Sequence, residues 1–388
     1  LDHMKHFGIT VDAQALAKAH VEHCPHCKPR GGLQVTCYGH RLVHSCCYGW
    51  RFPLHTEPPI QVLDNYKSLS TEEARPHVLA KMKALDAYGV FTRGTDTVPP
   101  QTSTVPLQAV IREKDRIAYN ERQSVENDLA KLKVRVCLDM SRNLNDYAPD
   151  WKFRYSGIDE VVPMLTKGCY FAILDLEKFF LQLPTHRSRW RYQCVFDPAT
   201  KRFRKYRRCP FGFKLTPAFA SAVSSEICEI LRHRGVEKCS VFVDDIIIIG
   251  DNKQACEAAL RTALRTCREL GFPVAPGKVV HPTQRAEYLG VEIDTVTGEL
   301  RISTERQQQL LQQVQSALKA GRLHKKETQR LLGKLNWCAS VMPGARAYMR
   351  RLWYYLATLP SRGRHRLTKG CTQDLEWWLD KLTNPTWR

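Results

Sequence analysis

Residues 241–250 read VFVDDIIIIG, so two adjacent aspartates, Asp244 and Asp245, stand between two apolar runs. Each run is short and rich in β-branched residues, which is typical of a buried strand. Burying an ionised carboxylate is costly unless a partner or a metal compensates, and two neighbouring carboxylates also repel each other. The pattern therefore predicts a hairpin whose turn carries the aspartates where a metal can neutralise them. Taken alone, the doublet fits an ordinary Asp-containing β-turn equally well.

A third carboxylate favours the metal site. Residues 170–180 read YFAILDLEKFF, which puts Asp175 at the end of another apolar strand. If this strand pairs with the strand at the doublet, Asp175 lies beside Asp244 and Asp245. Three such carboxylates suit two Mg²⁺ ions roughly 3.5–4 Å apart, the arrangement used for in-line phosphoryl transfer. Magnesium prefers hard oxygen ligands and completes its shell with waters and substrate phosphates.

Composition points to a nucleic-acid partner. The chain has 388 residues and a formal net charge of +20, an excess that attracts a polyanion through counterion release. Residues 201–208, KRFRKYRR, concentrate six basic side chains around two aromatic ones, which favours contact with phosphates and bases over a merely solvated hairpin. No run of about 18 apolar residues occurs, so we expect no membrane segment. The sequence indicates no particular oligomeric state.

The start of the chain, LDHMKHFGIT, is charged where a signal peptide would be apolar, and it lacks an initiator methionine. This start suggests that the sequence is a piece of a longer protein. The chain has 15 cysteines, several of them in apolar segments, and we expect reduced thiols in an intracellular compartment, cytoplasm or nucleus.

Hydrophobic periodicity predicts an α+β core followed by a helical tail. We expect strands at 106–112, 134–138, 170–176, 240–250 and 286–293. We expect helices at 71–88, 218–235, 253–270, 303–319, 325–340, 344–359 and 371–383, with only helical patterns after residue 303. In the first of them, Pro76 could instead mark the true start or a kink. The polar stretch between the first two strands is predicted to be a loop.

The first fifty residues form a distinct Cys/His-rich segment, with five cysteines and seven of the 14 histidines. Cys24, Cys27, Cys37 and His40 follow a C-x₂-C-x₉-C-x₂-H pattern, and two close-spaced pairs of such ligands suit a tetrahedral Zn²⁺. Four nearby side chains could replace one of these ligands: His23, His26, His44 and Cys46. Reduced thiols without a metal are the competing interpretation. The predicted module could bind nucleic acid or brace the neighbouring domain.

The order of several motifs resembles the reverse transcriptases of retroelements, RNA-directed DNA polymerases. The resemblance covers roughly residues 100–385 and is carried by AVIREKD, KVRVCLDMSRNLND, LDLEKFF, CPFGFKLTPAF, FVDD and a lysine before EYLG. It implies a right-hand fold with fingers, a palm built on an antiparallel sheet, and a helical thumb. We therefore expect an N-terminal module over 1–57, fingers and palm over 58–300, and a thumb with the start of a connection over 301–388.

The resemblance also implies roles at matching positions. Asp175, Asp244 and Asp245 match the aspartates that hold two catalytic Mg²⁺ ions. Lys114 and Arg135 match the fingers residues that grip the incoming triphosphate, and Lys131 or Lys133 could take the place of Lys114.

Further matches concern the nucleotide and the primer. Phe180 matches the aromatic residue that blocks a ribose 2′-hydroxyl, although an aromatic residue after a strand also suits a core position. Phe211 and Gly212 match the turn beneath the nascent base pair. Lys278 matches a lysine that supplies a proton to the leaving pyrophosphate, and residues 288–290 match the hairpin that holds the primer terminus.

The implied activity is RNA-templated DNA synthesis, in which the 3′-hydroxyl of a DNA primer attacks a dNTP on an RNA template. Two competing functions remain: a domesticated relative that binds nucleic acid without polymerising, and an RNA-directed RNA polymerase, against which Phe180 and the turn at Phe211 argue. One departure is Phe242, where many relatives have tyrosine, and it leaves the metal ligands intact. The segments 331–357 and 371–382 resemble the DIRS-like tyrosine-recombinase retrotransposons. A ribonuclease H domain usually follows in such polyproteins.

Overall fold

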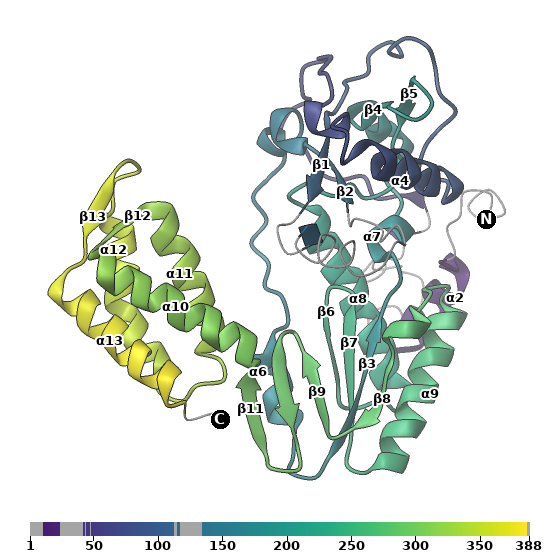
Figure 1. Cartoon of the computed structure of the whole chain (residues 1–388). Coiled ribbons are helices and arrows are strands. Elements are labelled where there is room, and N and C mark those ends of the chain that lie inside the picture. Colours follow the sequence, from purple (N-terminus) through teal and green to yellow (C-terminus); the bar gives the residue numbers. More distant parts are fainter. Residues whose placement is uncertain are drawn as a thin grey trace, which may run out of the picture.

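The structure is a computed structural model that describes residues 11–23, 42, 44–46, 48–111, 115–116 and 134–385. Three parts follow one another in Figure 1: an upper lobe, a central sheet unit below it, and a helical lobe beside the sheet unit. The mixture of helices and mainly antiparallel strands confirms the predicted α+β class. None of the described helices is both long and apolar enough to cross a membrane.

The sheet unit is built on four antiparallel strands in the order β6-β7-β3-β8. Their bounds are Tyr170–Asp175 for β3, Cys239–Phe242 for β6, Asp245–Gly250 for β7 and Val280–Thr283 for β8. Two long helices, α8 (Thr216–His233) and α9 (Lys253–Glu269), pack against these strands. Helix α9 begins where the Asn252 side chain accepts a hydrogen bond from the Ala255 amide, 2.8 Å away.

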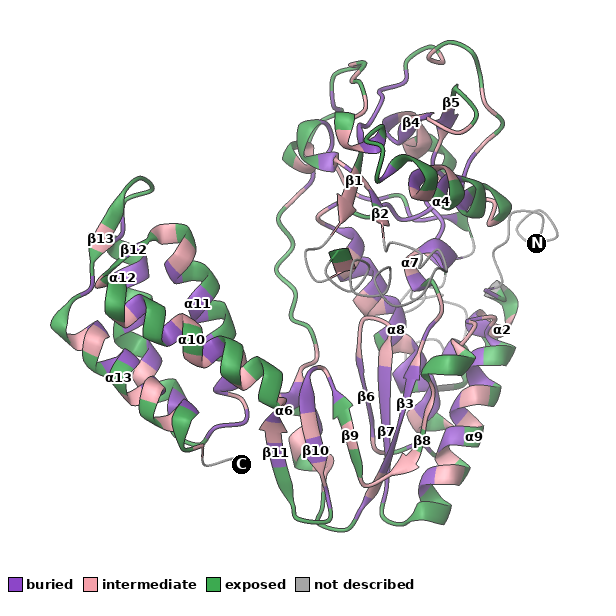
Figure 2. Ribbon diagram, viewed as in Figure 1, coloured by how far each residue is buried: buried purple, intermediate pink, exposed green. Residues whose placement is uncertain are grey.

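Strand β7 explains why four isoleucines follow one another in the sequence. Alternate side chains of a strand point to opposite faces of the sheet. Ile246 and Ile248 belong to the apolar cluster that includes α8 and α9, whereas Ile247 and Ile249 belong to a second cluster shared with the helical lobe. Both faces of the sheet are therefore covered, and β7 is buried except at its first residue, Asp245 (Figure 2).

A smaller three-stranded sheet, β11-β10-β9, links the sheet unit to the helical lobe. Its strands are β9 (Arg285–Tyr288), β10 (Val291–Asp294) and β11 (Glu299–Ile302). The single strand expected over 286–293 is therefore wrong. Leu289 (φ +51°) and Gly290 (φ +85°) take left-handed backbone conformations and reverse the chain between two strands.

The helical lobe contains α10 (Thr304–Ala320), α11 (Lys325–Cys338), α12 (Arg350–Thr358) and α13 (Lys369–Thr383). The prediction of only helices after residue 303 is wrong, because β12 (Arg322–His324) pairs with β13 (Arg364–Arg366). The helix predicted over 344–359 is divided. A 3₁₀ segment, η7 (Ala345–Met349), precedes α12, and Tyr348 within it is non-helical.

The upper lobe carries two hairpins and one long helix. Strand β1 (Leu107–Ile111) pairs with β2 (Val134–Leu138), and β4 (Cys194–Asp197) pairs with β5 (Arg202–Lys205). Helix α4 (Arg75–Ala87) begins at the alternative start expected near Pro76, which lies in its first turn. The remaining short helices are η1 (Lys67–Leu69), η2 (Met140–Arg142), η3 (Asn145–Tyr147), α6 (Ile158–Val161), η4 (Val162–Met164), α7 (Phe179–Gln182), η5 (Arg187–Tyr192) and η6 (Pro276–Lys278).

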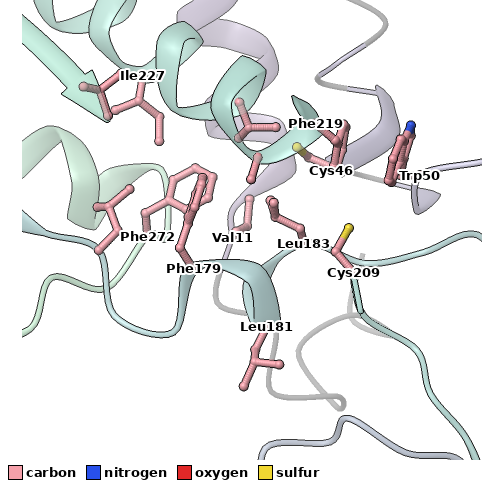
Figure 3. Close-up of a cluster of buried hydrophobic side chains, with 14 of the residues drawn as sticks. Val11, Cys46, Trp50, Phe179, Leu181, Leu183, Cys209, Phe219, Ile227 and Phe272 are labelled. Carbon is pink, nitrogen blue, oxygen red and sulfur yellow. The ribbon is translucent and has the colours of Figure 1, made fainter. Parts of the chain in front are cut away.

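The described part of the first 57 residues packs into the main apolar cluster. Helix α2 (Ala13–His23) lies against α8, where His20 Nδ1 is 2.6 Å from Glu226 Oε1. Trp50 is 5% exposed and stacks on Phe219 of α8 with ring centroids 4.4 Å apart. Figure 3 shows this contact, with Cys46 and Cys209 close by. This segment therefore contributes directly to the core beneath the sheet unit.

Candidate active site

The three aspartates meet at one end of the central sheet. Strands β3 and β7 pair in register, so Asp175 lies directly opposite Asp245. Asp244 occupies the turn before β7, and its carbonyl accepts a hydrogen bond of 2.9 Å from the Leu176 amide. The predicted pairing of the two apolar segments is thus confirmed, and it brings Asp175, Asp244 and Asp245 together.

The turn that carries Asp244 is tight and strained. Phe242 pairs with Asp245 across β6 and β7, which leaves only Val243 and Asp244 in the loop. Val243 has φ +58°, a left-handed conformation that is rare for a β-branched residue. Such outliers cost of order 1–3 kcal/mol and persist where the surrounding structure enforces them, often at functional sites. Here the enforcement comes from the strand pairing on either side.

The carboxylates repel one another, and the surrounding sheet partly buries Asp244 and Asp245. Burial raises the pKa of Asp244, and the charge of Asp175 raises it further. Burial raises the pKa of Asp245 to about 6, with contributions from both other aspartates. The positive counter-charge comes from Lys278, whose Nζ lies 2.7 Å from Asp175 Oδ2. This hydrogen bond raises the pKa of Lys278, so the lysine is cationic at neutral pH.

The donor set fits magnesium. The three carboxylates lie at the same end of the sheet, where burial and the neighbouring charges raise the pKa of Asp244 and Asp245, and a divalent cation would relieve their mutual repulsion. Within the described ranges, no group of three or more His, Cys, Asp or Glu side chains is arranged to hold a metal ion by itself. Mg²⁺ is usually bound by one or two carboxylates plus waters and substrate phosphates.

Backbone contacts from neighbouring segments hold the site. The Ala275 amide donates to the Asp175 carbonyl at 2.9 Å, which fixes the loop that leads to Lys278. The Tyr288 hydroxyl donates to the Asp245 carbonyl at 3.1 Å. The hairpin expected to hold the primer terminus is therefore tied directly to the strand that carries Asp245.

Phe180 and Phe211 form a second part of the site. Phe180 lies on α7 and is half-buried, and its ring centroid is 5.2 Å from that of Phe211, which is 40% exposed. Gly212 has φ +101°, and a Cβ there would lie 2.3 Å from the Leu138 carbonyl oxygen. The Asn145 amide group donates to the Gly212 carbonyl at 3.0 Å. The turn thus requires glycine and is anchored to the upper lobe.

The remaining predicted residues are only partly described. Arg135 is exposed on β2, opposite Val110 of β1. Lys114, Lys131 and Lys133 lie outside the described residues, as do all four predicted zinc ligands and His26. The other three alternative zinc ligands belong to the described residues. His23 is the last residue of α2, His44 is exposed, and Cys46 is 2% exposed within the apolar cluster.

The basic segment 201–208 differs from the prediction. Arg204, Arg207 and Arg208 are buried, so they cannot present a solvent-facing contact with nucleic acid. Arg204 pairs with Asp197 at 3.1 Å and also with Asp86, and Arg207 donates to the Gly89 carbonyl. These arginines are structural because buried guanidinium groups need such partners. Only Lys201, Arg202, Phe203 and Lys205 remain at least partly accessible in this segment.

One candidate was missed in the sequence. Residues 151–155 read WKFRY, and Trp151, Phe153 and Tyr155 are all exposed to solvent at 36% or more. The Tyr155 ring contacts Phe242, two positions before Asp244, with centroids 5.0 Å apart. Strict alternation of rings and cations was the signal that could have identified this segment.

The sequence is similar to known polymerases. A family described as "Reverse transcriptase (RNA-dependent DNA polymerase)" matches residues 127–293. The Pol polyprotein of transposon 412 of Drosophila melanogaster is 25% identical over 254 residues, 62% of this chain and 19% of that protein. The Gag-Pol polyprotein of avian reticuloendotheliosis virus is 30% identical over 184 residues, 45% of this chain and 15% of that protein. The chain therefore spans less than a fifth of these relatives.

Solved structures show the same fold. The foamy viral protease-reverse transcriptase in complex with double-stranded DNA aligns with a TM-score of 0.61 at 18% identity, covering 97% of this chain and 61% of that one. The same kind of protein in complex with an RNA/DNA hybrid aligns with a TM-score of 0.60 at 17% identity, covering 96% and 46%.

Removal of one charge from the carboxylate group should stabilise the metal-free protein. Because the pKa of Asp245 is raised in the folded state, its ionised form opposes folding, and this cost grows as pH rises above the unfolded value. We expect Asp245→Asn to gain roughly 1 kcal/mol at pH 7 after allowance for solvent screening. Thermal unfolding in a chelator, at neutral pH and near pH 4, measures the gain and its loss on acidification.

Asp64→Asn is the matched control, because Asp64 is exposed and far from the doublet in the sequence. It should change the melting temperature little at either pH. Equal melting temperatures for wild type and Asp245→Asn at neutral pH would contradict the proposed repulsion.

Proposed function

We propose that this chain, which contains a reverse transcriptase domain related to retroviral and retrotransposon Pol proteins, is an RNA-directed DNA polymerase. The upper lobe, sheet unit and helical lobe then correspond to fingers, palm and thumb. The substrates are dNTPs, a DNA primer and an RNA template. Two structural relatives form complexes with double-stranded DNA and with an RNA/DNA hybrid, which supports nucleic-acid partners for this chain.

The observation that carries the proposal is the register of β3 and β7. It sets Asp175 opposite Asp245, with Asp244 in the adjoining turn. We propose that these carboxylates hold two Mg²⁺ ions. When bound, the ions activate the primer hydroxyl as a nucleophile and neutralise charge on the phosphates. The carboxylates themselves supply the fixed negative charge that keeps such ions at the end of the sheet.

Other side chains would position and protonate the substrate. Lys278 is 65% exposed and hydrogen-bonded to Asp175, so its ammonium can reach a triphosphate beside the carboxylates and donate a proton to the leaving pyrophosphate. Arg135, with Lys114, is proposed to grip the triphosphate, since a guanidinium fork suits phosphate oxygens. The hairpin at 288–290 is proposed to hold the primer terminus, supported by the bond from the Tyr288 hydroxyl to the Asp245 carbonyl.

Phe180 is proposed to select deoxyribose. The centroid of its ring is 5.2 Å from that of Phe211. This contact restricts movement of the Phe180 side chain away from a bulkier sugar. Phe211 and Gly212 are proposed to support the nascent base pair, with the Gly212 carbonyl held by Asn145. A ribose 2′-hydroxyl would have to displace the Phe180 ring or leave its own hydrogen-bonding capacity unmet.

Four finer assignments accompany the activity. We propose a zinc module within residues 1–57, with Cys24, Cys27, Cys37 and His40 as ligands. The fingers and palm are proposed to span 58–300, and a thumb with the start of a connection is proposed to span 301–388. We also propose an intracellular location, cytoplasm or nucleus, supported by free thiols such as Cys194, Cys228, Cys267 and Cys338 in apolar surroundings. Within the family we propose a DIRS-like origin, supported by the resemblance of segments 331–357 and 371–382.

Primer extension tests the activity. With an RNA template, a DNA primer, dNTPs and Mg²⁺, the wild-type chain should extend the primer. Asp244→Asn should lower the rate roughly 10³-fold, because it removes a metal ligand worth several kcal/mol in the transition state. Asp64→Asn should retain full activity.

Binding of the RNA/DNA hybrid, measured in parallel, separates an enzyme from a binding protein. Hybrid binding without any extension by the wild type would favour the domesticated, non-polymerising relative and refute the enzyme.

Substitution of Phe180 tests sugar selection. Phe180→Ala should lower the ratio of kcat/KM for dNTP over rNTP by about 10-fold or more, since a steric block is removed. Phe180→Tyr keeps the ring and should preserve the ratio. An unchanged ratio in Phe180→Ala, with dNTP incorporation intact, would assign Phe180 to the core.

Elemental analysis tests the metal module. The purified full chain should contain one zinc ion, and the double variant Cys24→Ala/Cys27→Ala should lose it. Cys137→Ala removes a half-buried thiol of β2 and should leave the zinc content unchanged. Zinc-free wild-type protein with an intact fold would contradict the module.

A further inference from the structure

A cavity of about 570 Å³ lies in the upper lobe among side chains that the proposed catalytic mechanism does not use. Its walls come from the 92–102 loop, from η5 and from β5. Four cationic side chains and two aromatic rings line it: Arg93, Arg187, Arg191, Lys205, Trp190 and Phe203. The described lining residues include no carboxylate, so a metal ion or an amine would find no counter-charge among them.

Backbone hydrogen bonds hold the walls in place. The loop pairs with β5 at two points: the Thr95 and Phe203 backbones exchange bonds of 3.0 and 2.9 Å, and the Thr92 amide donates to the Lys205 carbonyl at 3.0 Å. On the other side, the Ser103 amide donates to the Arg191 carbonyl at 2.8 Å. The cavity is therefore pre-formed, which lowers the entropic cost of binding a ligand.

The buried arginine of β5 sets the direction of its neighbours. Arg204 is held inside the lobe by Asp197 at 3.1 Å and by Asp86. Because side chains alternate along a strand, Phe203 and Lys205 face the other way, where they line the cavity. Trp190 is fixed similarly, since its indole Nε1 donates to the Thr185 carbonyl at 2.8 Å.

Positive charge around the cavity exceeds its local compensation. The segment 187–191 reads RSRWR, and of its arginines only Arg191 forms an ion pair among the described residues, with exposed Glu57. Of the other lining cations, Arg93, Arg187 and Lys205 form no ion pair within the described part of the chain. An anion bound in the cavity would supply the counter-charge that they lack.

We propose that this cavity is a second nucleic-acid site, which binds a single strand through its phosphates and stacks a base on Trp190 or Phe203. Alternating cations and aromatic rings accept any base, because every base presents a π-face. A volume of this order accommodates a nucleotide unit. Free nucleotides share the same chemistry, but cations from three separate segments suit a strand that passes several of them. The site requires no polymerase activity.

A binding assay on the full chain tests the proposal independently of catalysis. A fluorescent oligothymidylate of about 12 nucleotides is titrated in a salt series, with excess blunt-ended RNA/DNA hybrid present to occupy the proposed polymerase site. The variant Arg93→Gln/Arg187→Gln removes two exposed cations from the cavity. We expect weaker binding by about tenfold and a salt slope smaller by about 1.4, or about 0.7 per lost phosphate contact.

The matched control is Lys253→Gln/Arg261→Gln, which removes two exposed cations from α9 and should leave the salt slope unchanged. Photocrosslinking with an iodouracil-substituted strand should label the peptides that contain Trp190 or Phe203. An unchanged slope in the cavity variant, or crosslinks confined to other peptides, would overturn the proposal. If dTTP displaced the labelled strand as effectively as unlabelled oligonucleotide does, the cavity would bind free nucleotides and not a nucleic-acid strand. Failure of primer extension would leave all these readouts intact.

Discussion

The antiparallel pairing of β3 with β7 is the constraint on which the site depends. It sets Asp175 opposite Asp245 and forces the chain to reverse within two residues, with Val243 in a left-handed conformation. The same pairing keeps solvent from the carboxylates, so their charges repel strongly. Holding three negative charges together therefore lowers the free energy of unfolding of the metal-free protein. Functional sites often reduce the stability of a fold in this way. Under the proposed function, bound cations would neutralise these charges, and substrate phosphates would complete the coordination of the cations.

The two faces of β7 explain how such a site is supported. Ile246 and Ile248 anchor it to the helices α8 and α9, and Ile247 and Ile249 anchor it to the cluster that reaches the helical lobe. A strand held from both sides can maintain a strained turn at its end. Because Tyr288 also bonds to Asp245, the β9–β10 hairpin is positioned by the strand that carries the aspartate. The helical lobe therefore shares one packed cluster with the strand that carries Asp245.

Much of this arrangement could be predicted from the sequence, because strong local signals agreed with the fold. The apolar runs at Asp175 and at the doublet predicted the strands, their pairing and the meeting of the carboxylates. Three failures share a cause, which is tertiary context. Leu289 and Gly290 break an apparent strand by their backbone conformation, and β12 and β13 form only by pairing between distant parts of the chain. Arg204, Arg207 and Arg208 were predicted to be solvent-facing because the sequence does not reveal that Asp86 and Asp197 would receive one of them inside the lobe.

The stacking of Trp50 on Phe219 has a consequence for any attempt to isolate the catalytic part. The matched family begins at residue 127, and a cut guided by it or by the Cys/His-rich boundary would discard Trp50 and Phe52. These rings pack on Phe213 and Phe219, at the start of the helix that supports the central sheet. A shortened chain would expose one side of its own interior as an apolar surface prone to aggregation. In its described portion, the Cys/His-rich segment is therefore an integral layer of the domain that follows it.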